Sequence, residues 1–133
     1  MDVEALLKEF DKFLEENYTK NRHTRQVLVS AMRRILREGK EPDELVLART
    51  SRVVYRRAYR LWKQFLRYKK IDAGPLLSTL RREGAIPLSR LRKMLYNAYK
   101  NRYDFSLAVL KGINLDKVYI NYTENEPILV YKD

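Results

Sequence analysis

The segment from Arg49 to Lys70 constrains the fold more than any other part of the chain, because its apolar residues recur at the spacing of an α-helix. A helix of this length must pack its apolar face against other elements. We therefore predict a helical domain around it. The inward residues of this predicted helix, which begins at Thr50 or Ser51 as cap, are Val54, Ala58, Leu61, Trp62 and Phe65.

Two further amphipathic segments supply its partners. The first helix is predicted behind Asp2 as N-cap, and its apolar residues recur every three or four positions from Val3 to Leu14. The second helix is predicted to run from about Asn21 or Thr24 to Glu38. A short helical turn is expected over Pro42 to Leu47. Together these segments predict a core among three helices.

A domain boundary is predicted at residues 71–74, and the chain beyond it is expected to combine helices with β-structure. A helix over Pro75 to Glu83 is followed by an extended segment at Ala85 to Pro87. A β-hairpin is expected at the end, because its two segments are rich in β-branched and aromatic residues. Those segments are Val118 to Tyr122 and Ile128 to Tyr131.

Two more helices are predicted between that extended segment and the hairpin. One is capped by Ser89 and turns four apolar residues inward, namely Leu91, Met94, Leu95 and Ala98. The other is capped by Asp104 and covers Phe105 to Lys111. Gly112 follows it as a helix stop.

The charge of the chain is large and uneven. Its 133 residues carry a net charge of +11, although residues 1–19 alone sum to −4, so the remainder carries +15. Between Arg49 and Lys70 there are nine basic residues and no acidic one. This excess predicts a polyanionic partner, either nucleic acid or an anionic membrane. We favour nucleic acid, because the bulky apolar residues are needed for the core and are not left for a lipid surface.

Helical geometry gathers most of that basic run on one face. At about 100° per residue, six basic side chains fall within a stripe roughly 80° wide. We name them the basic stripe: Arg52, Arg56, Arg60, Lys63, Arg67 and Lys70. Like charges at this spacing repel one another, so a purely structural helix usually carries interspersed glutamates. We therefore predict that the stripe, with Tyr59 at its border, follows phosphates. A solvated face with bridges to the acidic first helix is the alternative.

Other cations extend the expected contact with nucleic acid. The second helix offers Arg33, Arg34 and Arg37, and the C-terminal half offers Arg90, Lys93, Lys100 and Arg102. Arginine favours bidentate phosphate contacts. Several tyrosines lie among these cations and either stack on bases or pack at the edge of the core. They are Tyr55, Tyr59, Tyr96, Tyr99 and Tyr103.

Several classes of function are excluded or disfavoured. The chain has no cysteine and a single histidine, His23, so we expect neither metal nor cofactor. Neither phosphate-binding glycine motif occurs, and an isolated hydroxyl nucleophile lacks a base. We therefore expect no enzymatic activity. No apolar run reaches the length of about 18 residues that a membrane span needs, and we expect a cytoplasmic protein.

Residues 5–70 resemble a known type of domain. An amphipathic helix, the turn Tyr18 to Thr24, a second helix, Pro42 to Leu45 and the helix from Thr50 to Leu66 follow one another. This order resembles the SAM-like, core-binding N-terminal domain of tyrosine recombinases of the phage-integrase type, particularly archaeal ones. The resemblance implies a helical domain that clamps DNA through basic helix faces.

The second half allows two interpretations. Helix, extended segment, helix, helix and hairpin resemble a winged helix with residues 117–132 as its wing. It departs from that pattern because the segment Phe105 to Leu110 is apolar and poor in base-reading side chains. Alternatively, Leu88 to Asp133 is similar to the opening of a recombinase catalytic domain. The Thr-Gly-Leu-Arg segment, the His-x-x-Arg box and the nucleophilic tyrosine of that domain are absent, which implies a scaffold without an active site.

We therefore predict a mainly α protein with a SAM-like helical bundle at residues 1–72 and a winged-helix-like unit ending in a β-hairpin at residues 73–133. The expected function is non-catalytic binding of double-stranded DNA, as a recombinase-derived regulator or accessory factor. Two alternatives stay open. One is RNA binding, and the other is a protein-interaction module in which the acidic first helix docks on the basic stripe of a second copy, forming a homodimer.

Overall fold

The computed structural model describes residues 2–123 and 125–133. The described residues are mainly helical and end in a β-hairpin, as the sequence predicts. The predicted extended segment at residues 85–87 pairs with that hairpin and completes a three-stranded antiparallel sheet. The chain divides into two compact units, unit 1 up to Lys69 and unit 2 from Lys70. The predicted boundary after residue 72 lies in the short segment 71–73 that follows the third helix. Each unit is described by itself.

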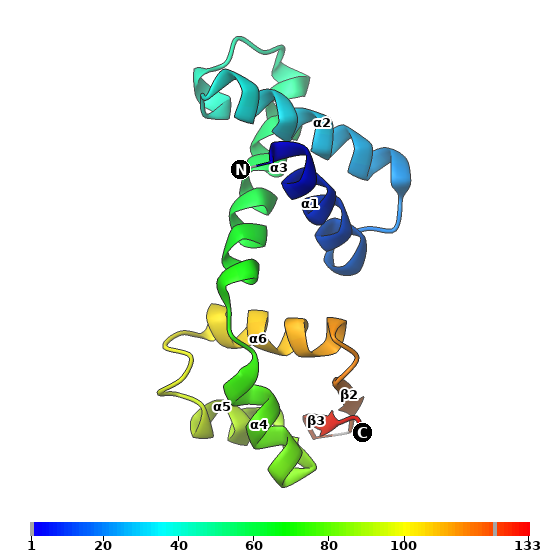
Figure 1. Ribbon diagram of the computed structural model, residues 1–133, viewed down its shortest axis with the longest axis vertical. Coiled ribbons are helices and arrows are strands. Elements are labelled where there is room, and N and C mark those ends of the chain that lie inside the picture. Colours follow the sequence, from blue (N-terminus) through cyan, green and yellow to red (C-terminus); the bar gives the residue numbers. More distant parts are fainter. Residues whose placement is uncertain (1, 124) are drawn as a thin grey trace. The chain divides into compact units, whose positions relative to one another are not determined.

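Unit 1 consists of three long helices and one short turn. Helices α1 and α2 run side by side, and α3 passes behind both of them (Figure 1). A 3₁₀ turn, η1, precedes α3 and is shorter than the predicted Pro42–Leu47 segment. The elements are α1 (Val3–Asn17), α2 (Arg22–Glu38), η1 (Pro42–Glu44) and α3 (Arg49–Lys70).

Aromatic packing between α1 and α3 forms the centre of the unit 1 core. Phe10 is completely buried, with its ring centroid 5.2 Å from that of Trp62 in an edge-to-face arrangement and 5.6 Å from that of Phe65. Such aromatic pairs add to the stabilisation from buried area. The predicted inward face of α3 is confirmed, since Ala58 and Leu61 are also buried. The apolar face of α2 closes the core with Leu28, Ala31, Met32 and Ile35.

The helix starts are confirmed for α1 and α2 and corrected for α3. The carboxylate of Asp2 accepts a hydrogen bond from Ala5 N (3.2 Å), which places it as N-cap. Asn21, one of the two predicted starts, caps α2. In α3 the Arg52 N–H already donates to Ala48 O (3.0 Å), so the helix begins at Arg49. Thr50 and Ser51 therefore lie inside the first turn and not at its cap.

Unit 2 surrounds its sheet with three helices. Strand β3 lies between β1 and β2 and is antiparallel to both. Leu129 of β3 is fully buried and pairs with Ile86 on one side and Ile120 on the other. The elements are α4 (Gly74–Glu83), β1 (Ala85–Pro87), α5 (Leu88–Met94), α6 (Arg102–Asn114), β2 (Val118–Tyr122) and β3 (Pro127–Tyr131).

Two predicted caps in unit 2 are wrong. Ser89 lies inside α5, where its hydroxyl donates to Glu126 Oε2 (2.8 Å) across to the end of the hairpin. Asp104 lies in the first turn of α6, and Asn101 is the cap because its side-chain oxygen accepts from Asp104 N (2.8 Å). Since α5 ends at Met94, the inward face continues only to Leu95. Met94 and Ala98, predicted to point inward, are exposed.

Gly112 does not stop α6, which continues to Asn114. The glycine is buried, and a Cβ added to it would lie 3.0 Å from Val118 Cγ2. Glycine is therefore required here for the close approach of α6 to β2 and not for a turn. The prediction failed because a buried glycine within a helix and a glycine that ends one give the same local sequence pattern.

Candidate nucleic-acid interface

The basic stripe lies on α3, is called the α3 stripe from here on, and is exposed over its whole length. All six of its cations lie on the solvent side of α3, opposite the aromatic core residues. From Arg52 to Lys70 the helix rises about 27 Å, since each residue adds about 1.5 Å. Arg49 extends the stripe by one more turn, since it lies three residues before Arg52 and is also exposed. Sequence reasoning missed Arg49 because it placed the start of the helix two or three residues too late.

Carboxylates of η1 and the residue before it lie against the middle of the stripe. Asp43 Oδ1 lies 2.8 Å from Arg56 Nε, and the Tyr59 hydroxyl donates to Glu41 Oε1 (3.3 Å). These residues line a shallow pocket of about 240 Å³ together with Arg60 and Lys63. The run that carries no acid in the sequence is therefore partly neutralised in space, by a segment that the sequence reasoning did not connect with it.

Tyr59 is held between this acidic segment and the stripe. Burial of its hydroxyl, followed by the charge of the nearby Glu41, raises the pKa of Tyr59. The Lys63 ammonium lies 4.8 Å from the centre of its ring, which is a cation–π distance. Tyr59 therefore stays protonated at neutral pH and presents a hydrogen-bond donor next to the cations.

Three members of the stripe carry uncompensated charge. Among residues 2–123 and 125–133, no carboxylate forms an ion pair with Arg52, Arg60 or Lys70. Arg52, Arg60 and Lys70 are therefore available for phosphate oxygens without first breaking an internal ion pair.

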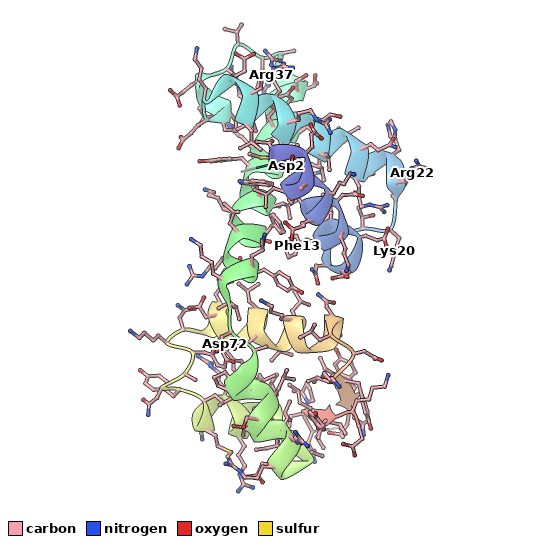
Figure 2. The ribbon with its side chains drawn as sticks, in the orientation of Figure 1. Asp2, Phe13, Lys20, Arg22, Arg37 and Asp72 are labelled. Carbon is pink, nitrogen blue, oxygen red and sulfur yellow. The ribbon has the colours of Figure 1, made fainter. Side chains whose placement is uncertain are left out.

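The three arginines predicted to bind nucleic acid on α2 differ in the contacts that they already make within the protein. Arg33 makes a two-pronged contact with Glu4, at 2.9 and 3.2 Å, and this guanidinium lowers the pKa of the Glu4 carboxyl. Arg34 lies 3.9 Å from Glu38 and over the ring of Tyr55. Arg37 is exposed at the C-terminal end of α2, opposite the end where Arg22 lies (Figure 2). Arg37 is thus the most accessible of the three.

Arg25 is a structural cation that sequence reasoning did not identify. Its side chain is buried to all but 9%, and it contacts Asp11 (3.0 Å), Glu15 (3.1 Å) and the Thr19 carbonyl (3.3 Å). Only its place on the inward face of α2, three residues before Leu28, signalled this burial in the sequence.

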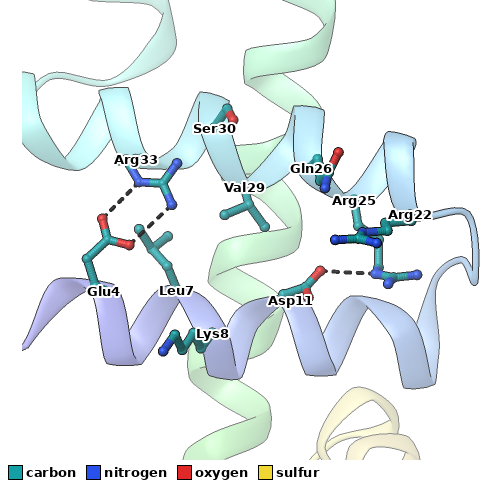
Figure 3. A pocket seen from close by; sticks show the side chains of 10 residues that line it. All are labelled: Glu4, Leu7, Lys8, Asp11, Arg22, Arg25, Gln26, Val29, Ser30 and Arg33. Atoms are coloured by element: carbon teal, nitrogen blue, oxygen red, sulfur yellow. Dashed lines mark hydrogen bonds and ion pairs between the residues drawn. The ribbon is translucent and has the colours of Figure 1, made fainter.

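A groove of about 500 Å³ between α1 and α2 is bounded by two ion pairs (Figure 3). Arg33 and Glu4 lie at one end, and Arg25 and Asp11 lie at the other. The charges that line it fasten the two helices to each other, and we assign no ligand to it.

The acidic face of α1 is used within the chain. Glu4, Asp11 and Glu15 contact arginines of α2, and Glu9 lies 3.0 Å from Lys69 of α3. The predicted bridges from the first helix to α3 therefore reach Lys69 and none of the stripe cations whose ion pairs are given above. A homodimer in which α1 docks on the stripe of a second copy has to break these internal contacts first.

The four cations predicted in unit 2 are all exposed. Arg90 and Lys93 lie on α5, Lys100 lies in the loop between α5 and α6, and Arg102 begins α6. The middle of α6 offers little to a ligand, because Phe105, Leu107, Ala108 and Val109 are buried. The predicted cations of unit 2 therefore lie at the start of α6, in the loop before it and on α5, and not along the middle of α6. Other exposed cations of the unit after α3 are Arg81, Arg82, Lys117 and Lys132.

Within the part of the chain that the structure describes, no group of three or more His, Asp or Glu side chains is arranged to hold a metal ion. None of the helices over the same residues is both long and apolar enough to span a bilayer. No family model, curated protein or solved structure matches the chain.

Proposed function

We propose that this protein is a non-catalytic protein that binds double-stranded DNA through the α3 stripe. The observation that carries the proposal is the row of exposed cations on one helix face, in which Arg52, Arg60 and Lys70 pair with no carboxylate of the described residues. A row of about 27 Å approaches the length of one turn of B-DNA. Contacts of this kind bind phosphates and give affinity without requiring a base sequence.

The arrangement of the elements supports the same proposal. We propose a SAM-like bundle for unit 1 and a winged helix for unit 2, with residues 117–132 as the wing. The order of helix, strand, helix, helix and hairpin in unit 2 supports the second assignment. Both assignments fit a recombinase-derived regulator or accessory factor that has kept the DNA-binding scaffold without an active site.

Salt dependence of binding to a random-sequence duplex tests the proposal. If the five stripe cations other than Arg56, which Asp43 neutralises, release counterions, the logarithm of affinity falls with the logarithm of salt concentration at a slope of roughly −4.5. The variant Arg52→Gln/Arg60→Gln/Lys63→Gln should reduce that slope by about 3 and weaken binding, because each replaced cation accounts for about 0.9. Its melting temperature should change little, since all three side chains are exposed.

A matched variant controls for total charge. Lys8, Lys12 and Lys20 are exposed and lie off the stripe and outside the proposed wing, so replacing all three by Gln removes the same charge from other places. The control should keep most of the affinity and the slope. Equal loss in both triple variants would mean that net charge and not the stripe attracts DNA. Binding that does not respond to salt, or that is absent at low salt, would overturn the proposal. Competition with duplex RNA and single strands separates DNA from RNA binding.

A further inference from the structure

The loop between α5 and α6, residues 95–101, presents an aromatic ring to solvent. Tyr96 is 68% exposed, which is unusual for a large ring that has the option of packing on the adjacent core. The neighbouring Tyr99 does pack there and is 94% buried. The two tyrosines, three residues apart in one loop, therefore have different roles.

Tyr99 and its neighbours hold the loop in place. The Tyr99 hydroxyl donates to Asp72 O (2.6 Å) and accepts from Leu76 N (3.3 Å). The backbone N–H of Tyr99 donates to the carbonyl of the buried Leu95 (3.0 Å). At the far end Asn101 caps α6. Because the loop is anchored at its start, its middle and its end, its backbone at Tyr96 loses little conformational freedom when a ligand binds.

Exposed cations lie on both sides of Tyr96 in the sequence. Lys93, Lys100 and Arg102 are exposed, and none of them forms an ion pair with a carboxylate of residues 2–123 and 125–133. The acidic residue nearest to this loop in the sequence is Asp104, and its carboxylate accepts a hydrogen bond from the Asn101 side chain (3.2 Å). An exposed ring with unpaired cations on both sides in the sequence offers one π-face and several phosphate contacts.

We propose that this loop is a second nucleic-acid site, which binds an unpaired nucleobase by stacking on Tyr96 and binds the adjacent phosphates through Lys93, Lys100 and Arg102. A base inside a duplex is covered on both faces by its neighbours, so the ligand is a single strand or an unpaired end. DNA and RNA share this chemistry. The site goes beyond the duplex contact proposed for α3 and does not depend on it.

Tyr122 provides a matched control on the same unit. It is also exposed (76%), but it lies at the end of β2 in the hairpin, where the nearby Glu126 contacts Ser89. No basic residue occurs between Lys117 and Lys132 in this segment. A ring without cations should contribute little to binding of a polyanion.

Binding of labelled oligothymidylate and oligouridylate, each about a dozen nucleotides long, tests the site. Tyr96→Ala should weaken binding by about tenfold, because one base–aromatic stack is lost. Tyr96→Phe keeps the ring and should bind like the unchanged protein, as should Tyr122→Ala. If Tyr96→Ala weakens binding of both oligonucleotides, the site accepts any unpaired strand. If it weakens binding of only one, the site is specific for DNA or for RNA. A 5-iodouracil version of each oligonucleotide should cross-link at Tyr96.

Several results would overturn the site. They are an affinity in Tyr96→Ala equal to that of the unchanged protein, equal loss in Tyr122→Ala, or no single-strand binding at all. Failure of the duplex proposal can be distinguished from failure of the Tyr96 site. If duplex binding is absent while the Tyr96 effect and cross-link persist, only the α3 proposal is wrong. If Arg52→Gln/Arg60→Gln/Lys63→Gln loses duplex binding and keeps the cross-link at Tyr96, the two sites are independent.

Discussion

Asp43 Oδ1 lies 2.8 Å from Arg56 Nε, although the two residues are 13 positions apart in the chain. The pair is exposed, with 69% of the Asp43 side chain and 59% of the Arg56 side chain accessible. Exposed ion pairs of this kind contribute little to stability. A phosphate that approaches Arg56 therefore competes with a weakly held internal carboxylate.

Removal of that carboxylate should strengthen DNA binding. In Asp43→Asn, Arg56 is no longer neutralised, and we expect affinity for duplex to rise several-fold and the salt slope to steepen by about 1. Glu83→Gln is the matched control, because Glu83 is an exposed carboxylate whose partner Arg82 (3.7 Å) lies on α4, outside the stripe and the proposed wing. Fluorescence anisotropy at a series of salt concentrations measures both quantities. An unchanged slope in Asp43→Asn would place Arg56 outside the DNA contact.

The Glu4–Arg33 pair should make stability depend on acid pH. Because Arg33 lowers the pKa of Glu4 in the folded protein, the pair contributes stability above the ordinary pKa of 4.5. That contribution disappears as the pH falls through the lower value of the folded state. Melting temperatures of Arg33→Gln should lie slightly below those of the unchanged protein at neutral pH and should converge with them in strong acid. A difference that stays constant over this range would mean that the pair is not its cause.

Arg25 should matter for stability more than any exposed arginine of α2. In Arg25→Met the apolar stem is kept, but contacts with Asp11, Glu15 and the Thr19 carbonyl are lost. We expect the free energy of unfolding to fall by about 1–2 kcal/mol, since the two carboxylates remain about half exposed and regain water. Chemical denaturation measures the change. Arg22→Met, an exposed position three residues earlier, should be nearly neutral, and equal effects in both variants would contradict a structural role for Arg25.

Tyr99 should set an alkaline limit on the stability of unit 2. Burial raises the pKa of Tyr99 above the ordinary value of 10.0, so folding favours the protonated hydroxyl. Its contribution is fully present below pH 10 and is lost as the pH rises through the folded value. Tyr99→Phe removes the bonds to Asp72 O and Leu76 N and should cost about 1–2 kcal/mol at neutral pH.

Melting curves between neutral and alkaline pH test this expectation. The difference in melting temperature between Tyr99→Phe and the unchanged protein should become smaller as the pH rises. Tyr119→Phe, an exposed hairpin position, should behave like the unchanged protein throughout. An equally steep alkaline loss in Tyr99→Phe would assign the pH dependence to other groups.

Local sequence pattern was sufficient for most of the helices. The spacing of Ala58, Leu61 and Phe65 predicted the buried face of α3, and polar side chains at Asp2 and Asn21 predicted two helix starts. Patterns failed where the deciding contact is distant in the chain. Ser89 has the residue type of a cap but bonds Glu126, and Gly112 has that of a helix stop but packs against Val118.

The sequence by itself determined that the chain is mainly helical and that one face of α3 is a row of cations, because both depend on the period of a single helix. Only the tertiary structure decided which cations are available. Asp43 neutralises Arg56, and Glu4 occupies Arg33. The tertiary structure also decided that Tyr96 is exposed while Tyr99 is buried. Electrostatic and packing contacts join residues that are close in space, and their spacing in the sequence does not specify them.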